Sequence, residues 1–210
     1  MMNHRRSQKS RVRPYRMGRR AENVGDTRRR IVEAAVRLHT TVGPAHTSIA
    51  GVAQEAGVTR LTVYRHFPDL DSLLLACGAH WETLHRSPDA DVWRTERTLR
   101  RRAARAFAEM YAWFRANSDE LAPIERDREA MPRPIIAAIA AQDRYRVDAL
   151  LASDGEDEAT TRRRRAVAGH FLDFRTWQSL TDGGLTDGEA AKLATWATSS
   201  HLAEGRPGGP

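Results

Sequence analysis

The segment from residue 47 to residue 67 constrains the fold more than any other part of the chain. It reads TSIAGVAQEAGVTRLTVYRHF. From residue 49 to residue 56, apolar side chains recur at the i, i+3, i+4, i+7 spacing of one helix face. Gly57 follows, where the helix must end and the chain must turn, and glycine adopts the positive φ that such a turn needs. Thr59 can then cap a second helix through its hydroxyl. The segment therefore predicts two short helices joined by a tight turn.

The second of these helices has an apolar back and a polar front. Val63 and Phe67 lie four residues apart and share one face. The residues left on the other face are Arg60, Leu61, Tyr64 and Arg65. The major groove of DNA accepts a short helix of this kind and offers acceptors and methyl groups to such side chains. The pattern therefore favours a DNA-binding helix-turn-helix over the alternative, a helical hairpin without a DNA role.

This segment closely resembles the helix-turn-helix of the TetR family of transcriptional regulators. The resemblance rests on Thr47-Ser48-Ile49, Ala53, Ala56-Gly57-Val58-Thr59 and Thr62-Val63-Tyr64-Arg65-His66-Phe67, and it extends from Thr27 to Leu74. It departs from the family at Leu70, where a lysine near a phosphate is common, and at His39, where a large aromatic residue is usual. It implies a sequence-specific DNA-binding regulator.

The resemblance also implies which side chains meet the DNA. The expected contact residues are Arg28, Thr47, Ser48, Thr59, Arg60, Leu61, Thr62, Tyr64, Arg65 and His66. Neutral donors that flank the second helix suit phosphates, and these are Thr47, Ser48, Tyr64 and His66. Base edges are expected to meet Arg60, Leu61, Thr62 and Arg65. The methyl groups of Leu61 could contact a thymine methyl.

Charge is distributed unevenly along the chain. Residues 1–30 hold eleven basic side chains against Glu22 and Asp26, a local charge of +9, whereas the whole chain carries +7. The remainder therefore carries about −2, and a basic end on a near-neutral body is typical of a polyanion-binding protein. We expect residues 1–21 to form a disordered basic arm. The alternative is an arm that serves only solubility.

Other classes of protein are less well supported by the sequence. The chain has no nucleophile elbow, no phosphate-binding P-loop, no zinc-protease motif and no glycine-rich dinucleotide fingerprint, so it is not expected to be an enzyme. With Cys77 as its single cysteine, it can form neither an intrachain disulfide nor a thiolate cluster. No metal, catalytic residue or cofactor is expected. The sequence shows no signal peptide and no apolar run of membrane-spanning length, so a cytoplasmic location without a membrane partner is expected.

The rest of the chain also reads as helices. The apolar periodicity and the breaks predict an all-α fold of about nine helices, with a three-helix head and a separate helical body. We expect the DNA-binding head and the start of a connecting helix at residues 22–80. A ligand-binding and dimerisation domain is expected at 81–203, and a flexible tail at 204–210. One long helix is expected over residues 156–180.

The family resemblance implies a homodimer, formed by the last two long helices, whose body holds a small-molecule effector. The aromatic and methionine stripes point to a largely apolar ligand, lined by Phe107, Met110, Trp113, Phe174 and Trp177. Asp143 and His170 fall on apolar stripes and could orient it. Such stripes also describe an ordinary packed core, and that alternative stays open. The function expected is a repressor released from a palindromic operator by this ligand. The alternative is an architectural DNA-binding protein without an effector.

Overall fold

The computed structural model describes residues 12–152 and 157–200, with side chains from Val24 onward. This part of the chain is all-α and contains no strand, as the sequence predicts. Its helices are α1 (Val12–Thr41), α2 (Ile49–Glu55), α3 (Arg60–His66), α4 (Leu70–Leu84), α5 (Ala90–Arg94), α6 (Leu99–Ala116), α7 (Ser118–Arg126), α8 (Arg133–Leu151), α9 (Glu158–Phe171), α10 (Phe174–Asp182) and α11 (Asp187–Ser199), with 3-10 turns η1 (Pro44–His46) and η2 (Arg128–Ala130).

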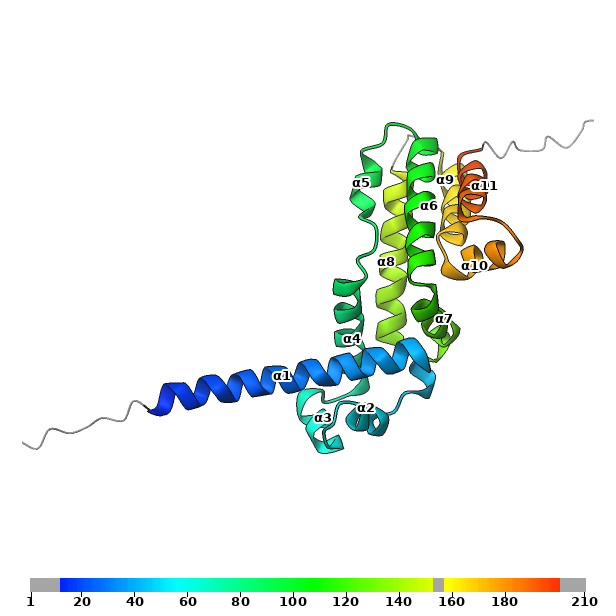
Figure 1. Ribbon diagram of the computed structural model, residues 1–210. Coiled ribbons are helices and arrows are strands. Elements are labelled where there is room, and N and C mark those ends of the chain that lie inside the picture. The colour runs from blue at the N-terminus through cyan, green and yellow to red at the C-terminus, as the bar shows by residue number, and fades with distance from the viewer. Residues whose placement is uncertain (1–11, 153–156, 201–210) are drawn as a thin grey trace, which may run out of the picture.

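The head consists of α1, α2, α3 and the first turns of α4. Helices α2 and α3 lie together on one side of the long α1 (Figure 1). Their apolar faces meet in one cluster of buried side chains: Ile31, Val32, Ala34, Ala35, Val52, Ala53, Ala56, Val63, Phe67, Leu73 and Cys77. The apolar faces predicted for α2 and α3 thus pack in this cluster, and they leave the opposite face of α3 uncovered.

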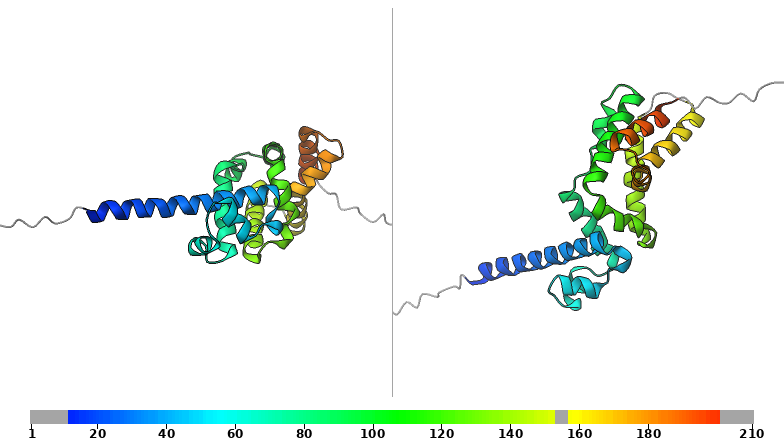
Figure 2. Two further views of the ribbon diagram at one scale, coloured as in Figure 1. Left: turned by 60° about the horizontal axis from the view of Figure 1, so that its bottom comes forward. Right: turned by 45° about the vertical axis from the view of Figure 1, so that its right-hand side comes forward.

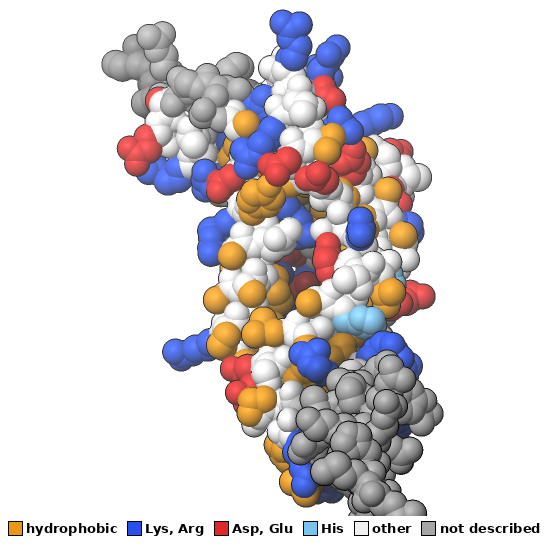
Figure 3. All heavy atoms as spheres, turned by 90° about the vertical axis from the view of Figure 1, so that its left-hand side faces the viewer, with side chains coloured by type: hydrophobic (Ala, Val, Ile, Leu, Met, Phe, Trp, Pro, Cys, Tyr) orange, Lys and Arg blue, Asp and Glu red, His pale blue; other side chains and the backbone are white. Residues whose placement is uncertain are grey.

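The body rises from the head along α4, with α6 and α8 as its long central helices (Figure 1). Both views of Figure 2 agree with this arrangement, and α11 packs against α6 while α9 packs against α8. The core between these helices is rich in aromatic rings. Its largest fully buried side chains include Trp93, Phe107, Tyr111 and Trp177. On the face seen in Figure 3, acidic and basic side chains intermingle at the end far from the head, while hydrophobic ones gather over the middle.

The body has two more helices than the sequence predicts. Helix α5 is one of them. Asp89 caps it, and the indole of Trp93 is fully buried and donates to Glu109 at 2.7 Å. The single helix expected over residues 156–180 is instead α9 and α10. Asp173 accepts from the backbone N–H of Arg175 and so starts a new helix after Leu172.

The N-terminal part of the described residues differs from the prediction. Helix α1 begins at Val12, so residues 12–21 of the predicted disordered arm are helical. Residues 1–11 and the predicted tail at 204–210 lie outside the described residues. Across the described ranges, no helix has both the length and the hydropathy needed to cross a bilayer.

Candidate nucleic-acid interface

The turn between α2 and α3 is built from capping interactions. The hydroxyl of Ser48 accepts from the backbone N–H of Gly51 at 3.1 Å and starts α2. At the other end of α2, the N–H of Val58 donates to Ala53 O at 2.9 Å, and Gly57 takes a φ of 64°. This is the Schellman motif, in which a left-handed glycine lets the chain leave the helix while the last carbonyl groups still accept hydrogen bonds.

The start of α3 follows directly from that turn. The hydroxyl of Thr59 accepts from the N–H of Thr62 at 3.2 Å and bonds with the Thr62 hydroxyl at 2.9 Å. Val63 is fully buried and Phe67 is 2% exposed, so both anchor α3 to the head. The predicted apolar back of this helix is therefore confirmed.

Two arginines of α1 hold α2 in place. Arg30 donates to Ala56 O at 2.5 Å, at the carboxyl end of α2, where a cation also suits the helix dipole. Arg37 pairs with Glu55 at 2.8 Å. Neither contact can be predicted from the sequence, because nothing in a one-dimensional pattern tells which surface arginine reaches a neighbouring helix.

The face of α3 that points away from the head carries most of the predicted contact residues. Leu61 is 60% exposed and Tyr64 is 52% exposed on this face. Arg60 and Arg65 are exposed beside them, and Thr62 and His66 are half-buried. Helix α3 has no acidic residue. The surface offered is therefore one of cationic donors, one phenol and one aliphatic group.

The remaining predicted contacts have partners inside the head. The Thr47 hydroxyl donates to Gly43 O at 2.9 Å, and the Ser48 hydroxyl is the α2 cap. Both hydroxyls keep acceptor or donor capacity, since a hydroxyl can make further hydrogen bonds. Arg28 lies with its guanidinium 4.7 Å from the centre of the Phe67 ring, so the end of α3 orients it.

The head is clamped to the body at one corner. Asp127, which follows α7, accepts from the backbone N–H of Ala45 at 3.1 Å, and Arg126 donates to Val42 O at 2.8 Å. Arg126 also donates to Asp127 at 2.8 Å. Gly43 sits between these contacts with a φ of 95°, and a Cβ there would clash with a carboxylate oxygen of Asp127. The turn before α2 is thus fitted closely to the end of α7.

The residues predicted to bind a ligand do not form one lining. Phe107, Met110 and Trp177 belong to the packed core, and the indole of Trp177 donates to Asp187 at 3.0 Å. His170 is exposed on α9, and its ring contacts Phe171. Phe107, Met110 and Trp177 therefore correspond to the alternative kept for the aromatic stripes, an ordinary packed core, whereas His170 lies at the surface.

The other predicted ligand residues line a pocket of about 110 Å³ in the body. They are Trp113, Asp143 and Phe174. Their polar neighbours were not predicted. Arg128 pairs with Asp143 at 2.6 Å and with Glu125 at 3.2 Å, and Arg146 approaches Asp143 at 3.5 Å. Asp143 therefore forms ion pairs and is not an isolated polar group in an apolar lining.

A second pocket lies where the head meets the body, and we call it the junction pocket. It has a volume of about 230 Å³. Helices α1, α4, α7 and α8 and the turns beside them supply its lining: Val36, His39, Thr40, Pro44, Leu74, Cys77, Gly78, Trp81, Leu121, Ile124, Glu125, Met131, Ile135 and Ile139. No sequence pattern reveals it, because its walls come from four separate segments.

Comparison with known proteins bears on the head. Residues 31–77 match the sequence profile of the bacterial regulatory proteins of the tetR family. The chain is 38% identical over 68 residues to the HTH-type transcriptional regulator TtgR of Pseudomonas putida, and equally so to the probable HTH-type transcriptional regulator ArpR of the same species. Each match covers 32% of this chain and 31% of the relative's length. Residues 31–77 are therefore similar to the helix-turn-helix region of tetR-family regulators, and the all-helical fold of the described residues agrees with this similarity.

Proposed function

We propose that the protein is a homodimeric repressor that binds a palindromic operator and leaves it when a small, largely apolar ligand binds the body. The observation that carries the DNA-binding part is the exposed face of α3. Leu61 and Tyr64 are more than half exposed between Arg60 and Arg65, while Val63 behind them is completely buried. Such a helix can enter a major groove with its base-reading side chains already held in place.

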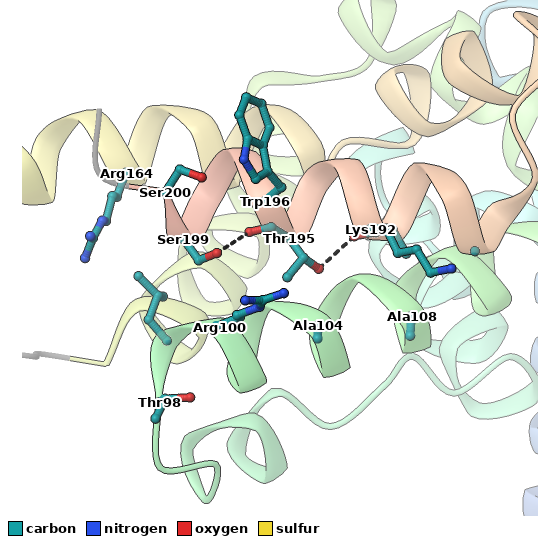
Figure 4. A pocket seen from close by; sticks show the side chains of 13 residues that line it. Thr98, Arg100, Ala104, Ala108, Arg164, Lys192, Thr195, Trp196, Ser199 and Ser200 are labelled. Atoms are coloured by element: carbon teal, nitrogen blue, oxygen red, sulfur yellow. Dashed lines mark hydrogen bonds between the residues drawn. The ribbon is translucent and has the colours of Figure 1, made fainter. Parts of the chain in front are cut away.

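The face shared by α6 and α11 supports a homodimer. A groove of about 800 Å³ runs beside Ala104, Ala108 and Ala191, and Trp196 stands out from α11 at its side, 66% exposed (Figure 4). Small residues next to a large exposed one make a surface that can fit a copy of itself, as a two-fold interface requires. In such a dimer, Trp196 of each protomer fills the groove of the other.

The dimer gives the operator its form. Two-fold symmetric heads bind two half-sites about 34–36 Å apart, one turn of DNA, so a palindromic sequence is expected. The ligand acts by binding more tightly to a dimer whose heads are spaced wrongly for DNA, and the shift cannot exceed that difference in affinity. The two pockets of the body and the clamp between α7 and the head support this arrangement.

The alternative function is an architectural DNA-binding protein without an effector. It requires a body that holds no ligand and a head that binds DNA without sequence preference. An experiment separates the two: random duplex DNA is selected on the purified protein, and the bound sequences are determined. A repressor enriches one inverted repeat and binds it as a dimer in analytical ultracentrifugation. If selection returns no common sequence, the architectural function is the better account.

A further inference from the structure

The junction pocket has the character of a binding site for a small apolar molecule. Aliphatic and aromatic side chains supply most of its walls, among them Leu74, Trp81, Ile124 and Met131. Its volume of about 230 Å³ exceeds that of an engineered protein cavity of about 150 Å³ that binds benzene. One substituted aromatic ring would fit.

Two of the ionisable side chains in the lining, His39 and Cys77, favour their uncharged forms. Burial lowers the pKa of His39 to about 4 and raises the pKa of Cys77 to about 12. Burial also raises the pKa of Glu125. The ion pair with Arg128, which lines the pocket of about 110 Å³, acts in the opposite direction. At neutral pH the imidazole and the thiol therefore carry no charge, and the pocket offers an ionic ligand little compensation for leaving water.

We propose that the junction pocket binds a neutral ligand with one aromatic ring or a similarly compact apolar body, and that this is the chemical class of the effector. That this ligand is the effector rests on the proposed function, whereas the binding site itself does not depend on it. It places the ligand between the head and the body, next to the edge of the aromatic core at Trp81 and Leu121.

The position of the pocket connects its occupancy to the head. Pro44 lines the pocket and belongs to the turn η1, in which the Ala45 N–H donates to Asp127. Arg126 donates to Val42 O just before this turn. Leu121, Ile124 and Glu125 line the pocket from α7, the helix that ends at this clamp. A ligand that separates α7 from α1 therefore acts directly on the turn before α2. The coupling needs no long path through the body.

Gly78 provides a variant that closes the pocket without disturbing its walls. It lines the pocket from the middle of α4, and a Cβ placed there meets no heavy atom within 4 Å. A leucine at this position fits the helix and occupies the space, and leucine is also the better helix former. Gly25 in α1 likewise has open space around a Cβ and lies outside the pocket, so Gly25→Leu is the matched control.

The test uses the full-length protein with ethylbenzene as the neutral probe, and benzoate and benzylammonium as its charged counterparts. Two readouts are followed: the melting temperature and the rate at which iodoacetamide alkylates Cys77, the only cysteine. A ligand that binds the folded protein raises the melting temperature. We expect ethylbenzene to raise it and to slow alkylation in the wild type and in Gly25→Leu, with an affinity at least about tenfold weaker in Gly78→Leu.

Each of the other possible results contradicts one part of the proposal. If ethylbenzene has no effect on the wild type, or acts equally on Gly78→Leu, the junction pocket is not the site. Equal effects of benzoate or benzylammonium would refute the preference for a neutral ligand. If ethylbenzene binds as expected but leaves operator affinity unchanged, the coupling to the head is wrong while the site stands. Failure to bind any operator would contradict the proposed function alone, since both readouts are independent of DNA.

Discussion

Asp127 accepts a hydrogen bond from the backbone amide of Ala45 at 3.1 Å, and this contact joins the end of α7 to the turn that precedes α2. The two residues are far apart in the sequence and belong to the body and the head. Arg126 reinforces the contact by donating to both Asp127 and Val42 O. The orientation of the helix-turn-helix on the body is therefore fixed at an identifiable point.

Replacement of Asp127 by asparagine should make this corner less stable in a pH-dependent way. The hydrogen bond from Arg126, followed by that from the Ala45 amide, lowers the pKa of Asp127 in the folded protein. The lowered pKa contributes stability at pH values above the ordinary aspartate pKa of about 4. That stability is lost as the pH falls through the pKa of Asp127 in the folded protein. Melting temperatures should differ most between wild type and Asp127→Asn at pH 7. A difference that persists unchanged at pH 3 would contradict the assignment.

Gly43→Ala should destabilise the protein by about 1–3 kcal/mol, because φ 95° and ψ 156° form a backbone region that side chains rarely enter. The new Cβ would also clash with Asp127. Denaturation in urea measures the change. Gly25→Ala is the control, since its Cβ meets nothing within 4 Å and alanine favours the helix. Equal stability of the two variants would show that the turn before α2 is free to rearrange.

Trp196→Ser should weaken the dimer. Large aromatic side chains at the centre of an interface contribute most of its binding energy, so a dissociation constant at least about tenfold higher is expected. Sedimentation equilibrium measures the constant, and Leu61→Ser, on the distant face of α3, serves as the control. If Trp196→Ser sediments as the wild type does, the dimer uses another surface or does not form.

The sequence predicts the head well because local rules determine it. The cap at Thr59, the turn at Gly57 and the buried pair Val63 and Phe67 all depend on neighbours within a few residues. The clamp of Asp127 on Ala45 could not be predicted, since it joins residues that only the tertiary structure brings together.

The body shows more plainly which features cannot be predicted from the sequence. The stripe that contains Phe107 and Met110 is apolar whether it packs or lines a pocket, and here it packs. The break at Asp173 was missed because the hydrophobic spacing continues across it, while only the capping geometry of Asp173 reveals a new helix. Where the pockets lie depends on how four helices meet, which no single segment encodes.

Removal of residues 1–18 should reduce the salt dependence of DNA binding. This end of the chain is strongly basic, and each phosphate that it neutralises releases a counterion. The slope of log affinity against log salt should therefore be smaller for the truncated protein, with sequence preference almost unchanged. An identical slope would show that these residues are a passive tail.

The central claim is that α3 reads DNA sequence through its exposed face. Fluorescence anisotropy of Arg60→Ala and Tyr64→Phe, each on the selected operator and on a scrambled duplex, tests it most directly. Arg60→Ala should lose about 1–3 kcal/mol on the operator and little on the scrambled duplex, because Arg60 meets base edges. Tyr64→Phe should weaken both duplexes alike, because the phenol meets a phosphate. Equal losses on both duplexes for Arg60→Ala would contradict the account.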